Sequence, residues 1–387
     1  MNGDLRVSIF TNTVGLHVLS LYKYLRDSLG GLRIFVSTPM ERGRDWTAEW
    51  GDLPVRVQKT LSYRTYKRYE GGFRDEIWRH IPYDTLPLLI RGRPDVVIST
   101  EFGFRTMQAA VYRMLFPKSR LIVWVGLSEH TEKGVPAWRV LQRKALLGLA
   151  DAVSANGTSA INYLQWLGVP SEKIFRLPYC PDISGHLKLP LEREPSAARR
   201  LLYVGGLSER KGLAPFLTVL SDWLRKRPDD RWELWIAGDG PLRVELERFS
   251  TPPQLRLQFL GSVAYERLPE LYAQGGVFVF PTLADEWGVV VNEALAAGLP
   301  VLGSVYSQAV KELVQEGETG WTFRPDQPEE VERALDRALL TPAPTLAGMR
   351  ETCRRTASQL TPSYGANQLL QAVRFAIASQ VPAPLEL

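Results

Sequence analysis

Short apolar runs alternate with amphipathic stretches along the first half of the chain. Runs typical of buried strands occur at 5–10, 32–36, 96–98, 121–125, 152–154 and 174–177. Between them, apolar residues recur every three or four positions, which predicts helices at 16–25, 106–115 and 137–149. Strands that alternate with helices favour a parallel sheet with both faces covered, so the first half is predicted to be an α/β domain.

The periodic pattern stops between Tyr179 and Arg200, where proline, glycine and charged residues predict a linker. It then restarts, with predicted strands at 201–204, 233–237, 257–260, 277–280 and 301–302. Predicted helices lie at 213–224, 242–249, 268–273, 288–297 and 368–378. We therefore expect an N-terminal domain at 1–180, a second doubly wound domain at 181–365, and a C-terminal helical segment at 366–387 that returns towards the first domain.

An acidic segment follows the predicted strand 277–280. Asp285 and Glu286 precede the predicted helix 288–297, and Glu293 lies inside it among valine, alanine and leucine. A carboxylate in such surroundings loses several kcal/mol of hydration unless a polar group pairs with it, so we expect a ligand there. Free N–H groups at the start of the helix favour an anion such as a phosphate. These N–H groups belong to Trp287, Gly288 and Val289.

The other strand-to-helix turns of the second half are rich in glycine and charge. They contain Gly205, Gly206, Arg210 and Lys211 after 201–204, Gly238 and Asp239 after 233–237, and Gly261 and Val263 after 257–260. Ligands of open parallel sheets bind beyond the carboxyl ends of the strands, so these turns and the acidic segment are expected to meet at one site. A hydroxyl-rich diphosphate such as a sugar nucleotide satisfies both the carboxylates and the cations.

Two residues of the first half are candidates to face the same ligand. Gly15 lies in the first strand-to-helix loop, where the backbone can approach donor phosphates, although a plain tight turn explains it as well. His130 follows the strand 121–125 and is a candidate to hydrogen-bond the donor or the acceptor, and a surface histidine is the alternative interpretation.

With these motifs the chain resembles the family 4 glycosyltransferases, which are retaining enzymes of the GT-B fold. The resemblance rests on residues 203–212, 238–241, 259–263 and 285–294, with weaker likeness at 151–154 and 181–182. It implies an α/β architecture of two Rossmann-like, doubly wound domains that face each other across a cleft. The first domain would then present the acceptor and the second would bind the nucleotide sugar.

The resemblance also implies roles for individual residues. Glu293 would hold the ribose hydroxyls, Asp285 would contact the donor sugar, Lys211 would bind the phosphates, and the backbone near Val263 would meet the base. Two positions depart from the family pattern, because Asp285 stands where a glutamate is usual and Gly206 stands where an arginine is common.

The predicted function is therefore transfer of a sugar, with retention, from a nucleotide diphosphate sugar to a hydroxyl acceptor on a glycan, a lipid-linked molecule or a small molecule. Asp285, Lys211 and His130 are the catalytic candidates. No metal or other cofactor is expected, because cations and a helix end offset the diphosphate charge. The alternatives are a catalytically silent sugar-nucleotide-binding module and a dinucleotide-dependent oxidoreductase, and the lack of G-x-G-x-x-G after the first strand of either half counts against the latter.

Charge and composition narrow the choice of partners. Residues 1–180 hold 25 Lys+Arg against 16 Asp+Glu, whereas residues 181–387 hold 22 against 26. The basic first half predicts peripheral association with an anionic membrane, and nucleic acid is not expected because aromatics and cations do not recur along one stacking surface. No apolar run approaches the length of a membrane span, no signal peptide is recognised, and two distant cysteines give no disulfide framework, so we expect a cytoplasmic protein, peripheral at the inner membrane face.

Overall fold

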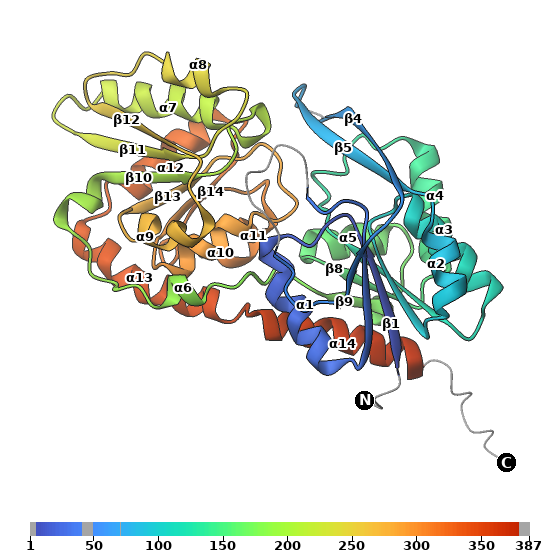
Figure 1. Cartoon of the computed structure of the whole chain (residues 1–387). Coiled ribbons are helices and arrows are strands. Elements are labelled where there is room, and N and C mark those ends of the chain that lie inside the picture. Colours follow the sequence, from blue (N-terminus) through green and yellow to red (C-terminus); the bar gives the residue numbers. More distant parts are fainter. Residues whose placement is uncertain (1–4, 41–48, 70, 379–387) are drawn as a thin grey trace. The chain divides into compact units, whose positions relative to one another are not determined.

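The computed structural model describes residues 5–40, 49–69 and 71–378, and within them the chain forms two compact α/β units (Figure 1). Unit 1 comprises the described residues of 1–67, 76–181 and 361–387, and unit 2 those of 68–75 and 182–360. The sequence prediction had placed 68–75 in the first domain and 361–365 in the second. The described residues of 68–75 group with unit 2, and residues from Pro362 onward form a helix that packs in unit 1.

Unit 1 is built on a parallel sheet with the strand order β3-β2-β1-β6-β7-β8-β9. Its strands are β1 (Arg6–Thr11), β2 (Gly31–Val36), β3 (Val55–Val57), β6 (Val96–Thr100), β7 (Arg120–Val125), β8 (Ala152–Ala155) and β9 (Ile174–Arg176). The six strands predicted from the sequence are confirmed. The edge strand β3 was missed because it is three residues long and mostly exposed, so it carries no apolar run.

Helices cover both faces of this sheet. Helix α1 (Leu16–Ser28) and the last helix, α14 (Pro362–Ala378), pack together on one face. The other face is covered by α2 (Thr85–Gly92), α3 (Phe104–Leu115), α4 (Ala137–Gly148) and α5 (Thr158–Trp166). The helices predicted at 16–25, 106–115, 137–149 and 368–378 are confirmed as α1, α3, α4 and α14.

A two-stranded hairpin, β4 (Thr60–Arg68) and β5 (Arg74–Pro82), was not predicted. Strand β4 is largely exposed and β5 is mostly half-buried, and neither carries the regular alternation of apolar and polar residues that marks a strand with one buried face.

Unit 2 is built on a second parallel sheet with the order β12-β11-β10-β13-β14-β15. Its strands are β10 (Arg200–Val204), β11 (Trp232–Ala237), β12 (Leu255–Gly261), β13 (Val277–Phe280), β14 (Val301–Ser304) and β15 (Gly320–Phe323). The five predicted strands are confirmed, and β15 is an addition. Strand β10 lies between β11 and β13, so the chain winds outwards from β10 in one direction and then returns to its other side. Such a switch point is where open parallel sheets bind ligands.

The helices of unit 2 surround this sheet. They are α6 (Ser184–Leu187), α7 (Leu213–Arg225), α8 (Arg243–Glu247), α9 (Leu268–Tyr272), α10 (Val289–Ala296), α11 (Gln308–Leu313), α12 (Pro328–Leu339) and α13 (Ala343–Ser358). The predicted helices correspond to α7, α8, α9 and α10. The predicted linker contains α6 and a short 3-10 turn at Pro195–Arg199. Within the part of the chain that the structure describes, no helix combines the length and apolarity needed to cross a bilayer.

Candidate functional site

Three predicted site residues form an ion cluster at the switch point of unit 2. The Lys211 Nζ lies 2.5 Å from Asp285 Oδ2, and Arg210 Nη1 lies 3.4 Å from the same oxygen. All three side chains are largely buried. Lys211 and Arg210 follow β10 and Asp285 follows β13, so the two loops that the topology predicts to converge do meet.

Backbone contacts between the loops hold this cluster in place. The Arg210 carbonyl accepts hydrogen bonds from the Leu283 N–H at 2.8 Å and the Thr282 hydroxyl at 3.1 Å. Gly212, at φ +68°, follows the cationic pair, and a Cβ there would lie 2.1 Å from the Pro281 carbonyl oxygen. Any other residue would push the β10 loop away from the β13 loop, so this glycine is required for Lys211 to reach Asp285.

The electrostatics of the cluster favour an ionised Asp285. Burial by itself raises the pKa of this carboxyl, but Lys211 and Arg210 outweigh it and hold the pKa below its usual value. Burial lowers the pKa of Lys211, and the pairing with Asp285 offsets part of that effect. Burial also opposes the charge of Arg210, yet its acidic partners raise the pKa of the guanidinium. Lys211 and Arg210 therefore both remain charged beside the ionised Asp285.

A fourth charged residue, Asp75, was not singled out from the sequence. Its Oδ2 accepts a hydrogen bond from Arg210 Nε at 2.6 Å, while Arg210 Nη1 donates to the Ala284 carbonyl at 2.9 Å. Asp75 lies at the tip of the unpredicted hairpin, 135 positions from Arg210 along the chain, so no local pattern could have revealed it.

Glu293 is buried in α10, with 3% of its surface exposed. One carboxylate oxygen, Oε2, accepts a hydrogen bond from the Tyr272 hydroxyl at 2.9 Å. Burial raises the pKa of Glu293 to about 7, and the hydrogen bond from Tyr272 opposes this only in part. Glu293 is therefore a buried acid, as the apolar residues around it in the sequence predict.

Two further polar residues near Glu293, His186 and Tyr265, were not among the residues predicted from the sequence. His186 is buried, and its ring lies 5.3 Å from that of Tyr272. Within the described residues, neither ring nitrogen of His186 nor the Tyr265 hydroxyl has a hydrogen-bond partner. Burial lowers the pKa of His186 to about 4, so the ring is neutral at physiological pH. Unused hydrogen-bonding atoms around a buried carboxylate are what a site for a hydroxyl-bearing ligand requires.

The acidic segment enters α10 through Gly288, at φ +103°, where a Cβ would lie 2.7 Å from the Phe280 ring. Gly288 is the N-cap of the helix, and Asp285 Oδ1 accepts a hydrogen bond from the Trp287 N–H at 3.4 Å. The prediction that the Trp287 N–H is free is therefore wrong. The Trp287 indole is buried and donates to Asn292 at 2.8 Å. No side chain caps Gly288, and the Val291 N–H donates to the Gly288 carbonyl at 2.9 Å, so the N–H groups of Val289 and Val290 are the ones at the start of α10 that remain for another acceptor.

The predicted glycine loops lie beside this cluster. The Leu207 N–H donates to the Asp239 carbonyl at 2.9 Å, and a Cβ on Gly238 would lie 2.0 Å from the Gly205 carbonyl, so the loops after β10 and β11 pack backbone against backbone. Space is open around Gly206, where the nearest atom to a Cβ would be 3.8 Å away. The Asp239 side chain is exposed and pairs with Arg243 at 3.2 Å rather than joining the Lys211 cluster.

The remaining predicted residues lie outside the Lys211–Asp285 cluster. Gly261, at the end of β12, accepts a hydrogen bond from the Gly238 N–H at 2.7 Å, and Val263 follows it in a half-buried loop. Glu286 is half-buried, and its carbonyl accepts from Gln308 at 2.8 Å. Gly15 and His130 belong to unit 1, where Gly15 is the N-cap of α1 and His130 lies in the turn after β7.

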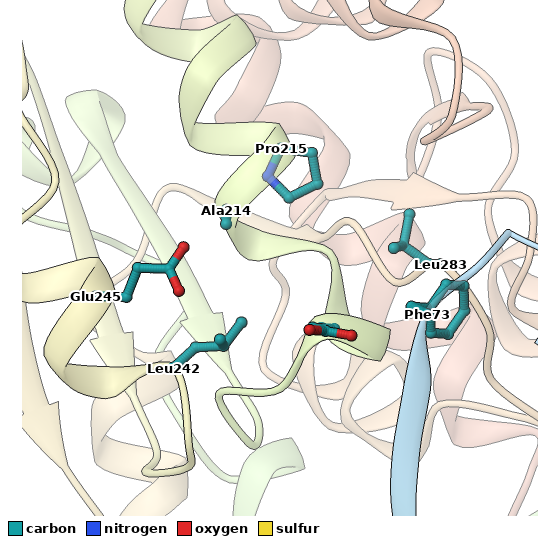
Figure 2. A pocket seen from close by; sticks show the side chains of 7 residues that line it. Phe73, Ala214, Pro215, Leu242, Glu245 and Leu283 are labelled. Atoms are coloured by element: carbon teal, nitrogen blue, oxygen red, sulfur yellow. The ribbon is translucent and has the colours of Figure 1, made fainter. Parts of the chain in front are cut away.

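A small hollow of about 270 Å³ lies beside Glu209, the first residue of the 3-10 turn that ends at Lys211. Figure 2 shows Phe73 and Leu283 at one side of it and Leu242 and Glu245 at the other. None of the predicted site residues lines this hollow, and most of its lining is apolar. It is therefore distinct from the charged site. Among the described residues, no group of three or more His, Cys, Asp or Glu side chains could hold a metal ion.

Comparisons with known proteins agree with this geometry. Residues 198–341 match the family described as "Glycosyl transferases group 1". Over 305 residues the chain is 28% identical to sulfoquinovosyl transferase SQD2 of Arabidopsis thaliana. The aligned region covers 71% of this chain and 55% of that protein. The chain spans about half or less of the length of the curated relatives that it matches first.

Solved structures resemble the chain over nearly its whole length. HepE of Anabaena, in complex with UDP, has a TM-score of 0.68 at 15% identity and covers 96% of this chain and 100% of its own. The apo form of WaaB, a lipopolysaccharide outer core galactosyltransferase, has a TM-score of 0.69 at 14% identity. The superposition covers 96% of this chain and 99% of WaaB. The predicted fold class is confirmed, and the chain has the GT-B fold.

Proposed function

We propose that this protein is a glycosyltransferase that moves a sugar, with retention of anomeric configuration, from a nucleotide diphosphate sugar to a hydroxyl acceptor. The observation that carries the proposal is the ion cluster of Lys211, Arg210 and Asp285 at the switch point of unit 2. The two buried cations are held by two carboxylates, Asp285 and Asp75, and their N–H groups can turn to an anionic ligand that takes over part of this pairing. A leaving nucleoside diphosphate supplies that anion.

Each residue then has a defined role. Lys211, Arg210 and the uncapped first turn of α10 stabilise the charge that grows on the diphosphate as the glycosidic bond breaks. Asp285 orients Lys211 and accepts hydrogen bonds from donor hydroxyls. Glu293, Tyr265 and His186 receive the ribose, because they present a buried carboxylate and polar atoms without partners within the described residues. His130 of unit 1 serves the donor or the acceptor.

Similar proteins support this choice of donor. Three solved structures of HepE, named as complexes with UDP, UDP and glucose, and UDP-glucose, share the fold of this chain. Retention is proposed from the resemblance of residues 203–212 and 285–294 to family 4 glycosyltransferases. A glycolipid acceptor is supported by the name of WaaB, which acts on a lipopolysaccharide outer core.

Asp285→Asn tests the ion cluster directly. The substitution removes the negative charge that holds the buried Lys211 ammonium in place, and transfer is expected to fall about 100-fold because a misplaced cation no longer matches the leaving group. The assay incubates the protein with UDP-, GDP- and ADP-sugars and alkyl glycoside acceptors, and detects the product by mass spectrometry. Asp222→Asn, at an exposed site of α7, is the matched control and is expected to retain full activity.

The same assay separates a transferase from a silent sugar-nucleotide binder. Calorimetric binding of one nucleotide sugar without any product, across the acceptor panel, would favour the silent module. Undiminished transfer by Asp285→Asn would refute the proposed role of the cluster. The anomeric configuration of an isolated product, determined by NMR, decides whether the reaction proceeds with retention.

Transfer is expected to be independent of divalent metal. Lys211 and Arg210 neutralise the diphosphate in the proposed mechanism, which makes a bridging cation unnecessary. We therefore expect the initial rate to remain within a factor of two when Mg²⁺ is replaced by excess EDTA. A loss of activity in EDTA that returns on adding Mg²⁺ or Mn²⁺ would contradict this assignment.

A further inference from the structure

Helix α3 of unit 1 presents an apolar face to solvent. Every exposed residue of this helix is apolar, with between 38% and 60% of each residue's surface accessible. These residues are Phe104, Met107, Val111, Met114 and Leu115. Their spacing of three and four positions places them on one side of the helix.

The polar residues of α3 point the other way, into unit 1. Arg105 is buried and donates to the Ser37 hydroxyl at 2.8 Å and to Asn12 at 2.7 Å. Gln108 accepts from the Leu86 N–H at 3.0 Å and donates to the Pro82 carbonyl at 2.6 Å. These bonds fix the rotation of the helix, so the apolar face cannot turn inwards without leaving a buried guanidinium and an amide unsatisfied.

Exposed apolar side chains occur on the neighbouring helices as well. Gln142 of α4 contacts Met107 of α3, and the exposed side chains of Trp138 and Leu141 lie on the same helix as Gln142. Trp166 of α5 is exposed as well. Figure 1 shows α2, α3 and α4 side by side, and all three pack on the same face of the sheet as α5. Apolar surface this extended is uncommon on a protein that faces only water.

The charged residues on these helices are all cations, of which Arg113 and Arg143 pair with Asp151 and Glu132 outside the helices. None of the helices α2 to α5 contains an Asp or a Glu. Two of their cations lie beside the exposed tryptophans, because Arg139 stands 5.1 Å from the Trp138 ring and Lys144 stands 5.8 Å from the Trp166 ring. The layer therefore combines apolar side chains, tryptophans and cations with no acidic residue of its own.

We infer that the exposed face of α3 and α4, hereafter the α3/α4 face, docks on an anionic lipid bilayer. Aliphatic side chains enter the acyl region, tryptophans favour the level of the headgroups, and cations attract anionic lipid. A protein partner is less suited, because an interface normally needs about one hydrogen bond per 100–200 Å² and the exposed residues of α3 offer no polar side chain. The inference extends the proposed function by adding a surface to which a lipid-borne acceptor would be bound.

Vesicle flotation tests this inference without any sugar nucleotide, so its outcome is independent of the proposed transfer. Wild-type protein is expected to float with vesicles of 30 mol% phosphatidylglycerol in phosphatidylcholine. Bound protein should fall severalfold between 0.1 and 0.5 M NaCl, because salt screens the contribution of Arg139 and Lys144. The Trp fluorescence should shift to the blue on binding.

The double variant Met114→Ser/Leu115→Ser is expected to bind these vesicles at least tenfold more weakly. Both side chains are exposed, so the thermal unfolding midpoint should not fall. The matched control is Val244→Ser/Leu340→Ser, which removes two equally exposed apolar side chains from unit 2 and should leave binding unchanged.

Any of three results would overturn the inference, the first two of them from flotation. One is wild-type protein that fails to float with any of these vesicles, and another is a serine double variant that floats as well as wild type. The third is a lipid-free dimer, seen by analytical ultracentrifugation, that Met114→Ser/Leu115→Ser abolishes while vesicle binding persists unchanged. That outcome would assign the α3/α4 face to a second copy of this chain.

Discussion

Replacing Lys211 with alanine is expected to reduce kcat/KM for sugar transfer on the order of 1,000-fold. The Lys211 ammonium is the buried cation closest to Asp285, at 2.5 Å, and is positioned to offset the charge of the departing diphosphate. Removing one preorganised group that stabilises developing charge in a water-poor site usually costs between 100-fold and 1,000-fold. Affinity for the free nucleoside diphosphate should fall less, about tenfold, because the charge on the leaving group is largest in the transition state.

The matched control is Lys226→Ala. Lys226 is exposed, pairs with Glu332 at 2.6 Å and lies on the same unit, so its loss tests only the net charge. We expect its kcat/KM to stay within a factor of two. Lys211→Arg should recover part of the activity, since a guanidinium keeps the charge but not the geometry. If Lys211→Ala and Lys226→Ala lose activity equally, the diphosphate is bound elsewhere.

The variant Glu293→Gln is expected to be more stable than wild type above pH 7 and yet to bind the donor more weakly. The pKa of Glu293 in the folded protein is about 7, above its usual value of 4.5. Below pH 4.5 the carboxyl is neutral in both folded and unfolded chains and costs nothing. As the pH rises from 4.5 to 7, the unfolded chain loses its proton first, so the free energy of unfolding falls by roughly 3 kcal/mol. A glutamine carries no charge and avoids this loss.

The difference in free energy of unfolding between wild type and Glu293→Gln should depend on pH in a way that only the Glu293 carboxyl explains. The free energies of unfolding of wild type and Glu293→Gln, measured in urea at pH 4.5, 6, 7 and 8, should diverge progressively in favour of the variant. Glu351→Gln changes an exposed glutamate of α13 and should remain parallel to wild type. A difference that stays constant across this range would mean that Glu293 is not destabilised by burial.

Donor affinity is expected to change in the opposite direction. An ionised carboxylate accepts hydrogen bonds from a ribose diol more strongly than a neutral amide does, so Glu293→Gln should weaken nucleoside diphosphate binding between 10-fold and 100-fold at pH 8. In wild type the affinity should rise between pH 6 and pH 8, because ligand binding favours loss of the proton. A residue with only a structural role would not raise stability and lower affinity together. UDP, GDP and ADP titrations by calorimetry provide the measurement.

The order of elements was accessible from the sequence because each element is specified by neighbouring residues. The buried strands β1, β7 and β13 are continuous apolar runs, and α7 repeats its apolar residues with a helical period. The meeting of Lys211 and Asp285 was also predictable, since parallel strands bring their carboxyl ends to the same edge of a sheet. The hairpin β4–β5 was not, because neither of its strands carries such a pattern.

Contacts between distant segments account for what was missed at the site. Asp75 reaches Arg210 from the hairpin tip, and Tyr272 reaches Glu293 from a different helix. The burial of His186 arises in a stretch that the sequence presented as a linker. In each case the partner is chosen by packing, and the sequence near either residue does not encode that choice.

Helix α3 shows which features the sequence determined and which the tertiary structure decided. The sequence by itself determined that residues near 106–115 form a helix with two unlike faces, because the period of 3.6 residues is a local property. Only the tertiary structure decided which face turns inwards. Ser37 and Asn12, far away in the chain, supply hydrogen bonds to Arg105, and satisfying that buried charge is what leaves the apolar side of the helix exposed.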